Sequence, residues 1–209
     1  MNFQKSTVFV IDDDASVCKA LERVLRATGL DVQAYASAPE YLARFDPDAA
    51  GCLVLDLSMP GFSGFELQDA LRARGGGPPI VFVSGQADVP DGVRAMKCGA
   101  VEFLTKPVDA AVLIDAVRKA IEKDRIERTA HAELAEVHRR LATLTRRESQ
   151  VLRCVVAGRL NKQTAGELGT VEKTVKVHRA CVMRKMQAKS LAELVQLAVR
   201  AGIASQSGV

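Results

Sequence analysis

The chain has 209 residues, five cysteines, no tryptophan and a formal net charge of +4. This length allows one large domain or two small ones, each able to bury a core. No stretch is long and apolar enough to span a membrane, and the first residues lack the apolar segment of a signal peptide, so we expect a cytoplasmic protein with no membrane partner. The odd number of scattered cysteines favours reduced thiols over a disulfide or zinc framework.

Charge is divided unevenly along the chain. Residues 1–124 contain 13 Lys and Arg against 18 Asp and Glu, a net charge of −5, whereas residues 125–209 contain 16 against 7, a net charge of +9. The division favours two domains with different partners: metal or phosphate chemistry suits the first, and a polyanion such as DNA suits the second. Ordinary variation in surface charge is the alternative explanation.

Short apolar segments alternate with amphipathic ones through the first 124 residues. The apolar segments predict strands at residues 7–11, 32–35, 52–57, 80–83 and 101–104. The segments between them predict helices at residues 15–27, 38–45, 64–74 and 89–97, and a further helix begins near Asp109. Short connections and right-handed crossovers make this a five-stranded, doubly wound parallel sheet, which is an α/β fold.

Polar side chains follow four of these strands: Asp12, Asp13, Asp56, Ser84 and Lys106. Because parallel strands end at one edge of the sheet, where open α/β sheets bind ligands, we expect these side chains to converge. Neighbouring carboxylates repel one another unless a cation is present, and oxygen ligands suit Mg²⁺, or Mn²⁺. Asp56 is then a candidate nucleophile toward a phosphoryl group, with Lys106 and Ser84 contacting the phosphoryl oxygens.

Each of these residues also has an ordinary structural explanation. Asp14 is expected to cap the helix that starts at Ala15, and Asp12 could do the same. Lys106 is compatible with a solvated loop, and Ser84 with a common Ser-Gly turn. Taken singly, these explanations compete evenly with a functional role, but their occurrence at four strand ends favours a site.

The second half begins with a long helical pattern. No Gly or Pro occurs from Val108 to Ala157, and we expect the helix that begins near Asp109 to continue to about Leu141. Its apolar stripe could pack on the chain's own domains or pair with a second copy, although fewer than three clean heptads disfavour a coiled coil. Thr145 and Glu148 then form a predicted capping box.

Four helices are expected after this linker: one ended by Gly158, one capped by Asn161, one at residues 172–186 and one at residues 191–201. The middle two fit a helix-turn-helix, within an all-α domain. Residues 172–186 can bury Val175, Val182 and Met186, and the other face would enter a DNA major groove. That basic outer face consists of Lys173, Thr174, Lys176, Arg179, Arg184 and Lys185. A solvated surface helix is the alternative.

Four segments of the first half resemble the receiver domain of bacterial two-component response regulators, over about residues 5–124: Val10 to Asp14, Leu55 to Gly61, Val83-Ser84 and Phe103 to Pro107. The resemblance implies that Asp56 is the phosphoacceptor. It implies that Asp13 binds Mg²⁺ directly, Asp12 through water, and Ser58 through its carbonyl. Ser84 would follow the phosphoryl group, Lys106 would pair with it, and Phe103 would be the aromatic residue that turns inward when Ser84 moves.

Residues 83–90 and 94–100 resemble the FixJ branch of these regulators more than other receivers. In that branch the fourth helix, fifth strand and fifth helix form the dimer face of the phosphorylated state. The resemblance therefore implies a homodimer when phosphorylated, with Val93, Arg94 and Lys97 as candidate contacts. Ordinary half-buried helix positions are the alternative.

Residues 143–203 resemble the LuxR/FixJ-type four-helix DNA-binding domain through four segments: Leu144 to Glu148, Asn161-Lys162, Glu172 to His178 and Val182 to Met186. The resemblance implies that bases are approached by Lys173, Lys176, Val177 and Ala180. It implies phosphate contacts by Asn161, Lys162, Thr174, His178, Arg179, Arg184 and Lys185, with packing as an alternative role for His178.

This domain departs from the pattern of its family at three positions. Thr164 stands where an aliphatic core residue is usual, and Gly166 should weaken its helix by about 1 kcal/mol relative to Ala. Val171 replaces the usual capping Ser, and we expect Thr170 to cap instead. These departures are expected to affect stability more than function.

We therefore expect three parts: a receiver domain at residues 1–124, a helical linker at 125–142 and a helix-turn-helix DNA-binding domain at 143–209. The expected protein is a transcriptional response regulator in which Mg²⁺-dependent phosphorylation of Asp56 by a sensor histidine kinase controls dimerisation and binding to double-stranded promoter DNA. RNA polymerase is a further expected partner, and turnover as an enzyme is not expected.

Two rival functions share part of this pattern. A metal-dependent phosphatase with an aspartyl nucleophile could share Asp56 and Lys106, but such enzymes usually carry a second acid where Ser58 stands. A regulator that binds a small autoinducer would share the C-terminal domain but would lack the acids at the strand ends.

Overall fold

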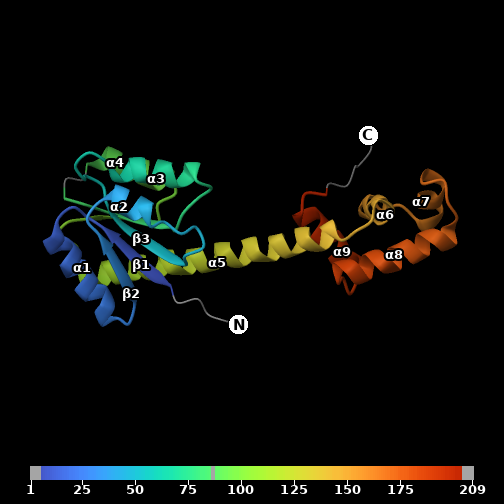
Figure 1. Ribbon diagram of the computed structural model, residues 1–209, viewed down its shortest axis with the longest axis horizontal. Coiled ribbons are helices and arrows are strands. Elements are labelled where there is room, and N and C mark those ends of the chain that lie inside the picture. Colours follow the sequence, from blue (N-terminus) through green and yellow to red (C-terminus); the bar gives the residue numbers. More distant parts are fainter. Residues whose placement is uncertain (1–5, 86–87, 204–209) are drawn as a thin grey trace. The chain divides into compact units, whose positions relative to one another are not determined.

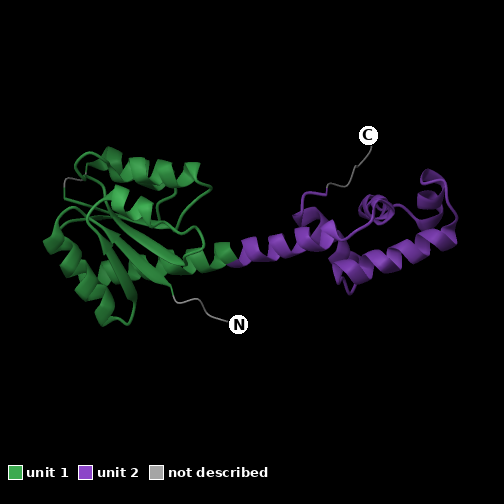
Figure 2. Ribbon diagram, viewed as in Figure 1, with its two compact units in different colours: residues 1–128 green, residues 129–209 purple. Residues whose placement is uncertain are grey.

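The computed structural model describes residues 6–85 and 88–203. The chain divides into two compact units, Met1–Arg128 and Thr129–Val209 (Figure 2). This division falls within the predicted linker. Gln86 and Ala87, which belong to a segment compared with the FixJ branch, lie outside the described residues, as do residues 204–209 of the predicted DNA-binding domain.

Unit 1 contains a five-stranded sheet in the order β2-β1-β3-β4-β5, and every neighbouring pair is parallel. The strands are β1 (Thr7–Ile11), β2 (Asp31–Tyr35), β3 (Gly51–Asp56), β4 (Ile80–Ser84) and β5 (Glu102–Thr105). All residues of β3 and β4 are buried, as expected for central strands that are covered on both faces. The prediction of a doubly wound parallel sheet is confirmed.

Helices cover both faces of this sheet (Figure 1). Phe9, Ile11, Leu53 and Leu55 pack in one core with residues of α2 (Ala38–Ala43), α3 (Gly64–Ala73) and α4 (Val89–Lys97). The alternate residues, among them Val8, Val10, Cys52 and Val54, pack in a second core with α1 (Ala15–Ala27) and α5 (Ala110–Ala142). The side-chain alternation of the strands therefore divides unit 1 into two apolar layers.

Unit 2 packs the C-terminal part of α5 with α6 (Arg146–Val156), α7 (Asn161–Glu167), α8 (Glu172–Met186) and α9 (Leu191–Arg200). Val175, Val182 and Met186 of α8 are fully buried, as predicted. The same core includes Val137 and, partly buried, Leu141, both from α5. The end of the long helix is therefore part of this core.

Two predicted helix caps are wrong. Asn161 is the first residue inside α7, and the capping position belongs to Leu160, whose side chain makes no cap hydrogen bond; the Gln163 side chain instead accepts from the Leu160 N–H at 2.9 Å. Thr170 does not cap α8, because Gly169 takes a left-handed conformation and Val171 then occupies the capping position without a side-chain bond. By contrast, the predicted caps at Asp14 and at Thr145 with Glu148 are present.

No helix in the described part of the chain is long and apolar enough to cross a membrane.

Candidate functional site

Three carboxylates meet where β1 and β3 end. These strands are direct neighbours in register, with Ile11 opposite Leu55, so Asp12 and Asp13 follow β1 beside Asp56 at the end of β3. One oxygen atom from each of the three carboxylates lies within 4.8 Å of the others. Asp12 and Asp56 are buried, whereas Asp13 is exposed. The predicted convergence of these acids is confirmed, and it forms a cluster of oxygen ligands suited to a divalent cation.

Lys106 reaches the same cluster from the end of β5. Its Nζ lies 2.6 Å from Asp12 Oδ2 and 3.5 Å from Asp56 Oδ1. The first distance is that of a charge-assisted hydrogen bond, and the second is that of an ion pair without one. The backbone hydrogen bonds between β4 and β5 continue to this lysine and position it: the Lys106 N–H donates to the carbonyl of Ser84 at 2.8 Å. The close pairing with Asp12 could not be predicted from sequence spacing.

Two polar atoms at this edge are buried without a hydrogen-bond partner: Asp56 Oδ1 and Ser84 Oγ. Ser84 is fully buried as the last residue of β4. Buried polar atoms are nearly always satisfied in proteins, and an unsatisfied pair is explained best by an absent ligand. The position of these atoms, beside the carboxylates and Lys106, marks the space where that ligand would lie.

Burial and charge shift the acid–base properties of the site. Burial raises the pKa of Asp56 above its ordinary value; Lys106 opposes this shift and Asp12 adds to it. Burial alone would lower the pKa of Lys106, but its hydrogen bond to Asp12 and the charge of Asp56 outweigh this, so its pKa is raised. Lys106 is therefore a stable cation, whereas Asp56 is less acidic than an exposed aspartate.

The loop after β3 begins beside Asp56. Ser58 is exposed, and its backbone N–H donates to Asp56. The first turn of α3 lies close to this loop, because a Cβ atom at Gly64 would be 2.6 Å from the Asp56 carbonyl oxygen. Gly64 is thus required for the close approach, a role that the sequence analysis missed although the preceding Ser63 marks the start of a helix.

Phe103 lies on β5, which pairs directly with β4, the strand that ends at Ser84. Its ring is half-buried, 6.5 Å from the ring of Phe82, and a Cβ atom at Gly92 of α4 would be 3.8 Å from it. The ring therefore lies between the central sheet and α4. This location is compatible with the predicted role as a switch residue, which remains a prediction.

On α8, the side opposite the buried Val175, Val182 and Met186 carries most of the predicted DNA contacts. The exposed members are Lys162, Lys173, Lys176, Val177, Ala180 and Arg184. The half-buried members are Asn161, Thr174, His178, Arg179 and Lys185. Val177 is 57% exposed, so it is accessible to a partner on this surface.

Three of the predicted phosphate contacts make hydrogen bonds inside unit 2. Lys185 Nζ lies 2.6 Å from Glu148 Oε2 and donates to the Thr143 carbonyl at 2.9 Å, so its charge holds α8 to the start of α6. Lys185 therefore has an internal role, and its predicted contact with a DNA phosphate remains a prediction. Arg179 donates to the Asn161 side chain at 2.9 Å and connects α8 with α7.

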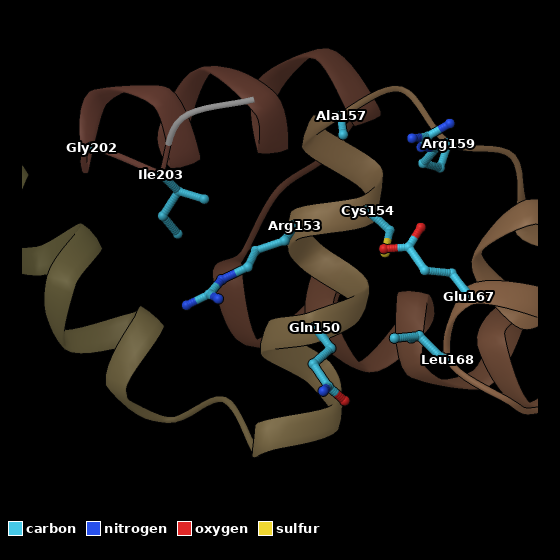
Figure 3. A pocket seen from close by; sticks show the side chains of 9 residues that line it. All are labelled: Gln150, Arg153, Cys154, Ala157, Arg159, Glu167, Leu168, Gly202 and Ile203. Atoms are coloured by element: carbon cyan, nitrogen blue, oxygen red, sulfur yellow. The ribbon is translucent and has the colours of Figure 1, made fainter. Parts of the chain in front are cut away.

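A cavity of about 530 Å³ also lies in unit 2, and none of its lining residues is a predicted DNA contact (Figure 3). It is lined by Gln150, Arg153, Cys154, Ala157, Arg159, Glu167, Leu168, Gly202 and Ile203. Figure 3 shows Cys154 and Glu167 pointing toward one another, and burial together with Glu167 raises the pKa of the Cys154 thiol. A protonated, buried thiol is a packing group and not a nucleophile.

The face of α4 carries several exposed apolar side chains. Val93 and Met96 are about half exposed, and Val89 is 81% exposed. Arg94 is also exposed, and its guanidinium lies 4.0 Å from the centre of the Phe65 ring. Lys97, about one helical turn later, is exposed too. The three predicted dimer contacts on this helix are thus accessible, and their role in dimerisation remains a prediction.

Known protein families match both units. Residues 8–118 match the family described as response regulator receiver domain, and residues 142–198 match the family described as bacterial regulatory proteins, luxR family.

Relatives with similar full-length sequences are found among bacterial regulators. The chain is 44% identical over 201 residues to Nodulation protein W of Bradyrhizobium diazoefficiens, covering 96% of this chain and 88% of that protein. It is 45% identical over 197 residues to the transcriptional regulatory protein FixJ of Azorhizobium caulinodans, covering 94% and 93%.

Solved structures agree with these relatives. The response regulator StyR is 45% identical, with a TM-score of 0.85, and the match covers 94% of this chain and 99% of that one. Full-length FixJ from B. japonicum is 39% identical, with a TM-score of 0.57, and the match covers 96% and 99%. The chain therefore belongs to the two-component response regulators of the FixJ/NarL type, with a receiver domain followed by a LuxR-type DNA-binding domain.

Proposed function

We propose that a sensor histidine kinase phosphorylates Asp56, and that this modification controls dimerisation and promoter binding. The observation that carries the proposal is the pair of buried atoms without partners, Asp56 Oδ1 and Ser84 Oγ, beside the Lys106 ammonium. A phosphoryl group on Asp56 would supply acceptor oxygens to both Ser84 and Lys106. The arrangement is thus more completely satisfied with a phosphoryl group than without one.

The transfer requires an ionised Asp56. A carboxylate oxygen attacks the phosphorus of a phosphohistidine on the kinase, the phosphorus–nitrogen bond breaks, and an acyl phosphate forms on Asp56. Lys106, which lies 3.5 Å from Asp56 Oδ1, offsets the charge of the transferred group. Ser84 donates its hydroxyl hydrogen to one of the new oxygens, and in doing so it leaves room for Phe103 to turn inward.

The carboxylate cluster fits a divalent cation. Mg²⁺, or Mn²⁺, would be held by Asp12, Asp13 and Asp56, with the carbonyl of Ser58 as a further ligand. When bound, the cation would neutralise these acids and the incoming phosphoryl oxygens. Lys106 already pairs with Asp12 at 2.6 Å, so the chain itself offsets part of the charge.

The DNA-binding surface is proposed to centre on α8. Lys173, Lys176 and Val177 are exposed there and would approach bases in a major groove, with Ala180 beside them. Phosphate contacts are proposed for Lys162, Thr174, His178 and Arg184, and for Asn161 and Arg179 as a bonded pair. A phosphate contact is proposed for Lys185 as well, although its Nζ also pairs with Glu148. RNA polymerase would be recruited once the promoter is bound.

Dimerisation is proposed to use the exposed face of α4. Val93 carries apolar surface there, and Arg94 and Lys97 supply charge. Phe103 packs against Gly92 of the same helix, so an inward turn of its ring would alter this face.

Beryllofluoride, a mimic of the phosphoryl group, tests the mechanism. With Mg²⁺ and beryllofluoride, the wild-type protein should dimerise in analytical ultracentrifugation and bind more tightly to a duplex that it has selected from a random library. Asp56→Asn should show neither response, because the oxygen that binds the mimic is replaced. Asp69→Asn is the matched control, since this carboxylate lies exposed on α3.

The two possible failures are distinguishable. A wild-type protein that binds beryllofluoride without dimerising or binding DNA more tightly would contradict the control of output. An Asp56→Asn variant that still responds would contradict the choice of phosphoacceptor.

A further inference from the structure

An ion pair between the buried Asp124 and the half-buried Arg128 joins α5 to the beginning of β3. Asp124 is only 5% exposed, and Arg128, one helical turn later, donates its Nε hydrogen to both carboxylate oxygens, at 3.0 and 2.9 Å. This bifurcated, charge-assisted hydrogen bond has a defined direction, unlike a contact between flexible surface charges.

The pair also satisfies the backbone at residues 47–51. Asp124 Oδ2 accepts from the N–H of Gly51, the first residue of β3, at 2.9 Å. The Nη2 of Arg128 donates to the carbonyls of Ala49 at 2.5 Å and Pro47 at 3.3 Å. Asp124 and Arg128 therefore form a clamp that grips one end of the strand whose other end carries Asp56.

The clamp lies where α5 leaves the receiver. Upstream, the helix packs on the sheet through apolar residues at helical spacing: Leu113, Ala116, Val117 and Ala120. The next positions at that spacing are Asp124 and Arg128, so the apolar contact is replaced by directional bonds. The division between the two units falls directly after Arg128, and residues 129–135 are all exposed.

Energetics argue that the clamp does more than stabilise the fold. The Asp124 carboxylate is almost fully desolvated and the Arg128 guanidinium partly so, and this desolvation offsets much of the attraction between the two charges. Its advantage is geometry: bonds to three separate backbone groups fix both the rotation and the axial position of a helix. An apolar side chain at position 124 or 128 would allow α5 to shift along its axis relative to β3, because apolar contacts have no fixed direction.

We propose that Asp124 and Arg128 are positioning residues that hold α5 in register with β3, so that phosphorylation of Asp56 is transmitted to the DNA-binding unit. This inference rests on the proposed function for the role of Asp56. The anchoring itself is independent of that role.

The double variant Asp124→Asn/Arg128→Met tests the clamp in the full-length protein. The asparagine oxygen still accepts from Gly51, and no buried charge is left unpaired, which favours folding. Hydrogen exchange of residues 121–135 reports the anchoring, and the gain in DNA affinity caused by Mg²⁺ and beryllofluoride reports the transmission. Glu122→Gln/Arg125→Met is the control, because it removes an exposed ion pair of the same helix and leaves Asp124 and Arg128 in place.

We expect exchange in residues 121–135 to accelerate about tenfold in the clamp variant, because local opening becomes easier. The gain in DNA affinity should shrink by about fivefold or more, whereas phosphoryl uptake from acetyl phosphate stays within about twofold of wild type. The control variant should match wild type in all three measurements.

Exchange and affinity gain that both equal those of wild type would overturn the proposal. Faster exchange with an unchanged affinity gain would overturn the role in transmission and leave a purely structural clamp. A wild-type protein that gains no affinity would defeat the proposed function instead, and exchange without beryllofluoride would still decide the anchoring. If the double variant does not fold, Asp124→Asn alone is measured in the same way.

Discussion

The receiver's candidate site and the DNA-binding unit differ in how their buried polar groups are bonded. In the receiver, Asp56 Oδ1 and Ser84 Oγ are buried without partners at the edge of the sheet. In the DNA-binding unit, the buried Glu148 is bonded to Thr145 and to Lys185, and the exposed cations lie on the surface of α8. A pocket that binds a small ion or a phosphoryl group contains buried polar atoms that form hydrogen bonds only when the ligand is bound. A surface that binds a polymer needs no such buried atoms, because the polymer never enters the core.

The largest expected effect concerns that outer surface. Lys162→Ala/Arg184→Ala, which removes two exposed cations proposed to contact phosphates, should weaken binding to a non-specific 40-base-pair duplex by about 100-fold and reduce the salt dependence by about two charges. Fluorescence anisotropy across a salt series measures both. Lys189→Ala, which removes an exposed lysine outside α8, is the control. An unchanged salt slope would place the DNA on another surface.

The second effect concerns the receiver alone. Mg²⁺ at about 100 times its dissociation constant should stabilise the receiver by about 2.7 kcal/mol, because it binds only the folded carboxylate cluster. Thermal unfolding with and without Mg²⁺ measures this, and Asp13→Asn should lose most of the stabilisation. Asp31→Asn, at the start of β2, is the control. Equal stabilisation of wild type and Asp13→Asn would mean that the cation binds elsewhere.

The third effect concerns the internal bonding of unit 2. Lys185 lowers the pKa of Glu148 from its ordinary value of 4.5, and the backbone N–H of Thr145 adds to the shift. A lowered pKa in the folded state gives stability that is present above pH 4.5 and is lost as the pH falls through the folded value. Glu148→Gln should therefore cost about 1 kcal/mol at pH 7.

Urea unfolding at pH 7 and at low pH checks the Glu148 prediction. The difference between wild type and Glu148→Gln should shrink below pH 4.5 and vanish at pH values below the lowered pKa of Glu148, where the wild-type carboxyl is protonated. A difference that persists there would mean that packing, and not the ion pair, is responsible.

The smallest effect contrasts two glycines. Gly166 lies inside α7 without a positive φ, and a Cβ atom there would meet nothing within 4 Å. Gly166→Ala should therefore raise the free energy of unfolding by about 0.5–1 kcal/mol. Gly64→Ala should lower it, because the new Cβ would lie 2.6 Å from the Asp56 carbonyl. Chemical unfolding of both variants would contradict this contrast if their stabilities moved in the same direction.

The receiver site was predictable because strand order and strand ends have simple sequence signals. The alternation of apolar strands and helices placed Asp12, Asp56, Ser84 and Lys106 at one edge before any contact was known. The caps at Asn161 and Thr170 were predicted wrongly because the turn before each helix sets which residue occupies the capping position.

Other features depend on contacts between distant residues and leave little trace in sequence. Asp124 and Gly51 are bonded although they are 73 positions apart, and Lys185 reaches Glu148 across 37 positions. A basic helix gives no indication of which lysine turns inward. The one available signal for the clamp is that Asp124 and Arg128 continue the spacing of the apolar residues before them, where a charge is unexpected.

The exposed part of α5, residues 129–135, belongs to none of the three hydrophobic cores described for the chain. Packing therefore places little restriction on which helix-forming residues occupy it. The length of this segment is more constrained. Each residue added to or removed from a continuous helix rotates the helix residues that follow by about 100° and shifts them by about 1.5 Å along its axis. In the evolution of such regulators, selection on this segment should act on the number of residues and leave their identities free to drift.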